Sequence, residues 1–162
     1  MKEYTSNTYY LIDKLFYLLV FSGLIGYFVY SLDNNNKIQI AGIVIISIFL
    51  ILFIRLTTKL ASIKFTESKI TVKYLITRKV LQIYYSSIIE IQYISGYQIS
   101  SLNIIKYKSD NIAINKVKLT SVVSQDKYIE FAKWIKNKNN KIEFKFFPPD
   151  LKLKSEFNKE FK

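Results

Sequence analysis

The chain has 162 residues, half of them hydrophobic, and a formal net charge of +12. It contains no histidine and no cysteine, so it lacks the commonest general base, the thiol nucleophile and the usual soft metal ligands. Its 12 acidic residues are scattered, and neither a glycine-rich phosphate loop nor a nucleophile-elbow motif is present. We therefore expect no enzyme, no metal site and no bound cofactor.

The positive charge lies after the first third of the chain. Residues 1–54 carry no net charge, residues 55–126 carry +7 and residues 127–162 carry +5. Such an excess suits an anionic lipid surface or a nucleic acid. Only two of the 24 cationic residues are arginines, which argues against nucleic acid, since base recognition favours arginine forks. Lysine usage in an AT-rich genome is the alternative explanation.

Two long apolar runs dominate the beginning of the chain. Leu15–Leu32 and Ile38–Ile54 have 18 and 17 residues and contain no charge. Each is close to the ~20 residues that cross a bilayer as a helix, and this chain is too short to bury two helices that are apolar all round. We expect a transmembrane hairpin in residues 1–59, with "DNNNK" at 33–37 as its tip. The alternative for the first run is a signal peptide, but no A-x-A-like cleavage site follows it.

The cations beside the spans orient the hairpin. The tip carries one lysine, whereas the two outer flanks carry Lys2, Lys14, Arg55, Lys59 and Lys64. The positive-inside rule then places both termini in the cytoplasm. The sequence predicts a multi-pass membrane protein, with the lipid bilayer as the partner of the hairpin.

Small residues on both spans indicate how the helices pack. They are Ser22, Gly23, Gly26, Ala41 and Gly42. Such residues let helix backbones approach closely, so we expect the two spans to pack on each other, with a dimer interface as the alternative. Neither span contains an ionisable residue, which argues against a transporter.

After residue 60 the hydrophobic period changes to an alternation. Ile63 and Phe65, and then Ile70 and Val72, alternate with polar residues, as in half-buried strands. The turn signals "TES", "TRK" and "DN" separate about six such strands. The alternation slips near Asn115, which predicts a β-bulge.

One amphipathic helix follows the strands. Its apolar stripe comprises Tyr128, Phe131, Ala132 and Ile135, and Ser124 precedes it as the expected N-cap. The fold class is therefore a membrane-anchored α+β protein. Its soluble part, residues 60–138, is expected to be an antiparallel β-sandwich or open barrel capped by a C-terminal helix.

The stretch "IKFTESKITVKYLITRKVLQIYYSSIIEIQ" resembles the opening of bacterial pleckstrin-homology-like (PH-like) domains, and "DKYIEFAKWIKN" resembles their C-terminal helix. Members of that family often follow membrane hairpins, so the resemblance implies that the hairpin lies in the inner membrane of a bacterium. The resemblance covers roughly residues 60–138 and implies a binding or oligomerising module without catalytic activity. The segment "GYQISSLN" is poorer in glycine than the family pattern, and a tail follows the helix. Phosphoinositide binding is not carried over, because the fold hosts many functions.

Residues 139–162 form the tail. "IEFKFF" alternates and predicts an edge strand, and "PP" at 148–149 ends it. Beyond the prolines, a short amphipathic helix is expected, with the apolar stripe Leu153, Phe157 and Phe161. Three uses of this stripe remain open: docking on the chain's own domain, contact with the inner leaflet and binding of a partner protein.

Three functions are compatible with these patterns. The first is a membrane-anchored scaffold that binds an unknown protein partner or itself, through Leu153, Phe157 and Phe161 and through an exposed sheet edge. The second is a basic domain that reads anionic lipid headgroups through Lys69, Lys73, Arg78, Lys79, Lys116 and Lys118. The third is an immunity protein against a membrane-acting toxin.

Overall fold

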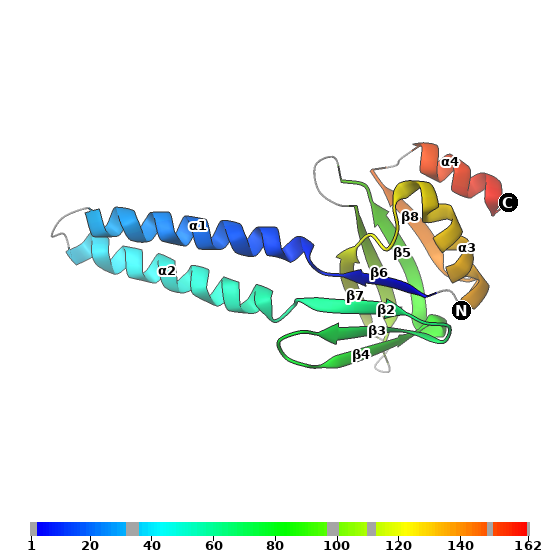
Figure 1. The fold of residues 1–162 in the computed structure, drawn as a ribbon, viewed down its shortest axis with the longest axis horizontal. Helices are drawn as coiled ribbons and strands as arrows, with labels where there is room; N and C mark the ends of the chain where they lie inside the picture. Colours follow the sequence, from blue (N-terminus) through cyan, green and yellow to red (C-terminus); the bar gives the residue numbers. More distant parts are fainter. Residues whose placement is uncertain (1–2, 32–35, 97–100, 110–112, 149–150, 162) are drawn as a thin grey trace.

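The computed structural model describes residues 3–31, 36–96, 101–109, 113–148 and 151–161. A long pair of antiparallel apolar helices extends from one side of a domain, and that domain consists of two four-stranded sheets and two shorter helices (Figure 1). The chain is therefore an α+β protein, as the sequence predicts.

The long helices are α1, Tyr10–Ser31, and α2, Asn36–Thr57. Both are long and apolar enough to cross a membrane, and only 6% of the apolar stretch of each helix is buried. The domain covers the beginning of α1, where Leu11 and Leu15 are buried. Both apolar runs predicted from the sequence lie within these helices, apart from Leu32, which with residues 33–35 of the expected tip lies outside the described residues.

The two long helices pack most closely at Gly42. A Cβ atom added there would lie 2.2 Å from Cγ2 of Val29 in α1. At Gly26 an added Cβ would meet Cδ1 of Ile46 at 3.9 Å, and at Gly23 it would meet nothing within 4 Å. The predicted close packing of the two helices is thus confirmed at Gly42, whereas Gly23 does not take part in it.

The first sheet has the order β1-β2-β3-β4 and is antiparallel throughout. Its strands are β1 (Tyr4–Asn7), β2 (Ala61–Phe65), β3 (Lys69–Tyr74) and β4 (Val80–Tyr84). The alternating residues of β2 and β3 that the sequence singles out are buried. The sequence did not indicate β1: residues 4–7 were assigned to the hairpin, yet Tyr4 pairs with Phe65 and Asn7 with Ser62. The helix pair is thus an insertion between two neighbouring strands.

The second sheet has the order β7-β6-β5-β8. Its strands are β5 (Ile88–Ile94), β6 (Leu102–Lys108), β7 (Ile114–Thr120) and β8 (Glu143–Phe147). The bulge predicted near Asn115 is wrong, because β6 and β7 pair in continuous register. The alternation slips there because Ile114 lies on the outer face and is 65% exposed. The register shift lies instead in β5, between Ile88 and Glu90. The "DN" turn at 110–111 is outside the described residues.

The shorter helices are α3, Tyr128–Lys138, and α4, Leu151–Glu160. The predicted stripe of α3 is buried in the domain core. This helix begins later than expected, because Gln125–Lys127 form a 3-10 turn, and the Ser124 side chain makes no capping hydrogen bond. The tail contains both predicted elements, the edge strand β8 and the helix α4, but β8 runs parallel to β5.

The two sheets meet where β1 approaches β7. The Ser6 hydroxyl donates a hydrogen bond of 2.6 Å to the carbonyl oxygen of Thr120, whose own hydroxyl donates one of 3.0 Å to Oδ1 of Asn7. These bonds bring the base of the helix pair beside the outer strand of the second sheet (Figure 1).

Candidate anion-binding site

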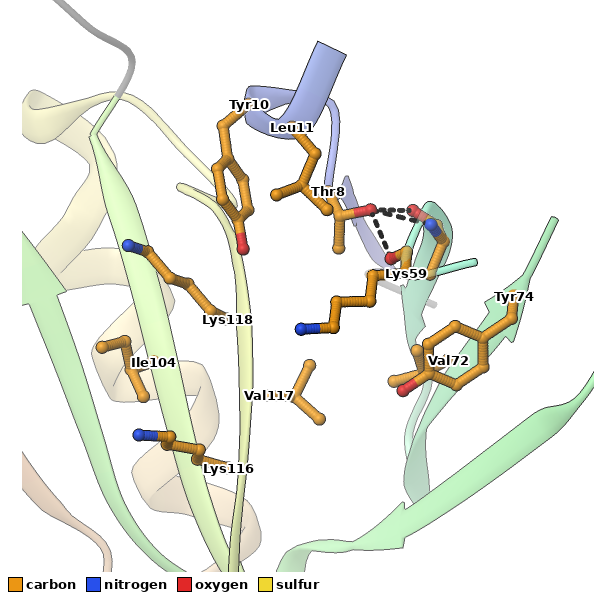
Figure 2. Close-up of a pocket in the computed structure, with 11 residues that line it drawn as sticks. Thr8, Tyr10, Leu11, Lys59, Val72, Tyr74, Ile104, Lys116, Val117 and Lys118 are labelled. Carbon is orange, nitrogen blue, oxygen red and sulfur yellow. Dashed lines mark hydrogen bonds between the residues drawn. The ribbon is translucent and has the colours of Figure 1, made fainter. Parts of the chain in front are cut away.

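A cavity of about 440 Å³ lies where the helix pair joins the domain. Residues of β1–α1, of the α2–β2 connection, of β3 and of β7 line it, and Figure 2 shows them around the opening. The cavity is therefore built from segments that are distant in sequence, and the base of the hairpin forms part of its wall.

Thr8 holds this junction together. Its side chain is buried, and its hydroxyl accepts a hydrogen bond of 2.7 Å from the backbone N–H of Ala61. The same hydroxyl donates one of 3.1 Å to the carbonyl oxygen of Lys59. The segment that enters α1 is thus tied to the segment that leaves α2, which fixes the backbone from which the Lys59 side chain extends.

Three lysines line the cavity. Lys59 extends between Val117 and Tyr74, and Lys116 and Lys118 extend from the other face of β7, with Ile104 between them (Figure 2). The alternation of β7 explains this arrangement, because Val117 and Leu119 face the core while the lysines face outward. The cations therefore flank the edge of β7 on both sides.

The electrostatic character of the cavity is positive. None of the described residues that line it carries a carboxylate. Within the described part of the chain, the ion pairs to carboxylates involve other lysines. The ammonium group of Lys118 lies 5.3 Å from the centroid of the neutral Tyr10 ring, an attraction that does not cancel its positive charge. Such a group of cations favours an anionic ligand.

A second, apolar hollow of about 390 Å³ adjoins this site on the helix pair. Its floor consists of Leu18, Leu52 and Leu56, and its cations are Lys14, Arg55 and Lys59. Lys59 lines both hollows. The apolar groove on the helix pair and the cationic cavity on the domain therefore share the Lys59 side chain as part of their walls.

The six cations predicted to contact lipid do not form one cluster. Lys116 and Lys118 line the cavity. Lys73, Arg78 and Lys79 lie at or beside the turn between β3 and β4, and all three are exposed. Lys69 lies at the other end of β3, where its ammonium group donates a hydrogen bond of 3.0 Å to Oε1 of Gln82.

The tail residues predicted to bind a partner pack largely on the chain's own domain. Leu153 is buried, which corrects the expectation that it is presented on the surface. The ring of Phe157 lies 5.3 Å from the rings of both Phe144 and Phe146 in β8. Phe161 lies at the end of the stripe, exposed and against Phe157. Of the three uses left open for this apolar stripe, the position of α4 corresponds to docking on the chain's own domain.

Glu90 is the buried carboxylate of the domain, and its surroundings are structural. Lys106 and Lys145 contact its two oxygens at 2.9 and 2.6 Å, from the strands on either side of β5. Burial alone raises the pKa of this carboxyl, but hydrogen bonds from Lys145, Lys106 and Gln92 outweigh burial and lower the pKa to about 2. Glu90 is therefore held ionised, which does not suit a general acid or base. The described residues contain no group of three potential metal ligands.

Lys59 is the site residue that sequence reasoning did not include. In the sequence it stands out only as a flanking cation of the second apolar run. Its link to Lys116 and Lys118 depends on β7 lying beside the base of the hairpin, which no local pattern reveals. A scan of protein-family models and a search of curated proteins found no match to this chain.

Proposed function

We propose that the chain is a non-catalytic, membrane-anchored binding module. The helix pair crosses the bacterial inner membrane, both termini lie in the cytoplasm, and the β domain stands at the inner surface. There, the cavity at the base of the hairpin binds the phosphate-bearing headgroup of an anionic lipid. The observation that carries this proposal is the group formed by Lys59, Lys116 and Lys118, which line one cavity together with described residues that carry no carboxylate.

The position of the cavity favours a lipid over a soluble anion. If α1 and α2 cross a bilayer, the end of α2 marks the interface, and Lys59 follows that end by two residues. The apolar groove lined by Leu18, Leu52 and Leu56 on the helix pair shares Lys59 with the cavity. A phospholipid offers both parts at once: an anionic headgroup for the lysines and an acyl chain for the groove.

We propose further that the domain is PH-like. The strands β1 to β7 form two sheets of antiparallel neighbours, and α3 packs into the core after them. This order supports the resemblance in "IKFTESKITVKYLITRKVLQIYYSSIIEIQ". In this proposal the membrane hairpin replaces the loop between the first two strands of the domain.

The test counts lipid molecules bound to the full chain in detergent, using native mass spectrometry. Phosphatidylglycerol, phosphatidylcholine and glycerol phosphate are compared, so that an anionic lipid, a neutral lipid and a free phosphate are distinguished. The triple variant Lys59→Gln, Lys116→Gln and Lys118→Gln is expected to lose ~100-fold in affinity for phosphatidylglycerol, since each of the three cations near the headgroups contributes about 1 kcal/mol.

A variant with the same change in net charge serves as control. Lys127→Gln, Lys154→Gln and Lys159→Gln remove three exposed lysines of the 3-10 turn and of α4. We expect this control to bind phosphatidylglycerol as the natural chain does. Equal losses of phosphatidylglycerol affinity in both triple variants would show that net charge alone causes the effect. Preferential binding of glycerol phosphate would contradict a lipid ligand.

A protein-binding scaffold is the second candidate, and the edge of the first sheet favours it. Within the described residues, β4 pairs with β3 alone, and Val80 and Tyr84 on this strand are each 54% exposed. An extended segment of a partner or of a second copy fits such an edge. Replacing Gln82 by proline removes a backbone donor of β4. Loss of a co-purifying partner in that variant, with lipid binding retained, would support this role.

A further inference from the structure

The turn between β3 and β4 gathers several exposed apolar residues of the described domain. Leu75, Ile76 and Val80 are 46%, 58% and 54% exposed. We use "β3–β4 tip" for residues 75–80, which contain these three together with Thr77, Arg78 and Lys79. Exposed apolar side chains gathered on one turn indicate a surface that contacts something apolar.

The β3–β4 tip lies beside the chain that leaves α2. The backbone N–H of Leu75 donates a hydrogen bond of 2.8 Å to the carbonyl oxygen of Leu60, three residues after the end of α2. The three residues from the end of α2 to Leu60 span at most ~10 Å when extended, and paired strands lie about 4.8 Å apart. The Leu75 backbone therefore lies no farther from the end of α2 than these two distances together. Figure 1 shows the tip on the side of the domain from which the helix pair extends.

The charge around the β3–β4 tip suits an anionic surface. Lys73, Arg78 and Lys79 are exposed, and residues 68–89 contain no acidic residue. Arg78 adopts a φ of 55°, a conformation in which glycine is favoured over a residue with a Cβ atom. A cation thus occupies a position of the turn where local backbone preference favours glycine.

We propose that the β3–β4 tip inserts Leu75 and Ile76 into the interface of the bilayer, as a second contact of the domain with the membrane. This inference rests on the proposed function, because the end of α2 sets the depth of the interface. The apolar side chains enter the boundary between headgroups and acyl chains, and Arg78 and Lys79 contact phosphates above it. Together with the hairpin, this contact fixes the tilt of the domain, so that the lysine cavity opens toward the headgroups.

The test uses the absence of cysteine in the natural chain. Ile76→Cys is labelled with the fluorophore NBD, and the full chain is reconstituted into vesicles that contain phosphatidylglycerol and nitroxide-labelled phosphatidylcholine. Ile48→Cys, on the exposed surface of α2, reports membrane insertion of the hairpin. Ser86→Cys, exposed at the far end of β4, is the matched control on the domain. Thermal unfolding of each labelled variant shows that it is folded.

We expect NBD on Ile76→Cys to lose about half of its fluorescence to acyl-chain nitroxides, as suits a probe ~5–10 Å below the headgroup boundary, and NBD on Ser86→Cys to lose none. Quenching at Ile48→Cys without quenching at Ile76→Cys would overturn this inference and leave the proposed function intact. Absence of quenching at both positions would overturn the membrane anchor and the inference together. Equal quenching at Ile76→Cys and Ser86→Cys would also overturn the inference, since contact would not be confined to the tip.

Discussion

Thr8 and Ala61 are 53 residues apart in the chain, yet the Ala61 backbone N–H donates a buried hydrogen bond of 2.7 Å to the Thr8 hydroxyl. This bond closes the base of the helix pair against the domain. Thr8→Val keeps the shape of the side chain but leaves a buried backbone donor without its partner. We expect a loss of ~1–3 kcal/mol in the free energy of unfolding, measured by chemical denaturation of the full chain in detergent.

Thr5→Val is the control for this effect, because Thr5 lies on β1, the strand that leads to Thr8, and its side chain is exposed. Its free energy of unfolding should stay within ~0.5 kcal/mol of the natural chain, as is usual for surface substitutions. Equal effects of the two variants would show that the Thr8 hydroxyl does not hold the junction.

The contact of Gly42 with Val29 predicts the response of the helix pair to a single methyl group. Because an added Cβ would lie 2.2 Å from a Val29 methyl carbon, Gly42→Ala forces the helices apart. We expect a cost of ~1–3 kcal/mol, as for other overpacked sites. Gly23→Ala adds the same methyl group where nothing lies within 4 Å. Thermal unfolding in detergent should therefore separate the two variants, and a neutral Gly42→Ala would contradict the described packing.

The buried carboxylate of Glu90 should make the stability of the domain fall at acidic pH. Its pKa is about 2 in the folded chain, below the ordinary value of 4.5, so the folded state binds the proton less tightly than the unfolded state. The stabilisation is fully present above pH 4.5 and is lost as the pH falls toward 2. It amounts to about 3 kcal/mol at most.

Unfolding titrations across this pH range should show a steeper loss of stability in the natural chain than in Glu90→Gln. The variant keeps the size of the side chain but cannot ionise. The same slope in both proteins would show that another carboxyl group causes the acid dependence.

Phe157 predicts that α4 is a structural part of the domain. Its ring packs on Phe144 and Phe146, so Phe157→Ala should lower the free energy of unfolding by about 2 kcal/mol. Phe161→Ala, at the exposed end of the same stripe, should cost much less. If α4 instead leaves the domain to bind a partner, both variants should unfold like the natural chain.

Local periodicity predicted the elements whose pattern is strong. Ile63 and Phe65 alternate as a half-buried strand, and Tyr128, Phe131 and Ile135 recur at helical spacing, so burial of one face follows from the sequence. The small residue Gly42 likewise indicated close helix packing. These features depend on neighbours along the chain.

The elements that the sequence did not reveal depend on distant partners. Tyr4–Asn7 is short and mostly polar, and it becomes a strand because the helix pair returns Ser62 to its side. β8 pairs in parallel with β5 at one edge of the second sheet. The alternation of apolar and polar residues in β8 does not determine which sheet edge this strand joins. Lys59 joins Lys116 and Lys118 through the same long-range arrangement. The sequence therefore singled out two of the three cavity lysines and not Lys59, the lysine at the junction.

The membrane crossing of the helix pair tests the account most directly. Single cysteines are introduced by Lys37→Cys, at the far end of the helix pair, and by Ser155→Cys, on the exposed face of α4. In intact bacterial cells, a membrane-impermeant maleimide should label Lys37→Cys and spare Ser155→Cys, and in inside-out vesicles the pattern should reverse. Labelling of both positions from the same side of the membrane would contradict the account.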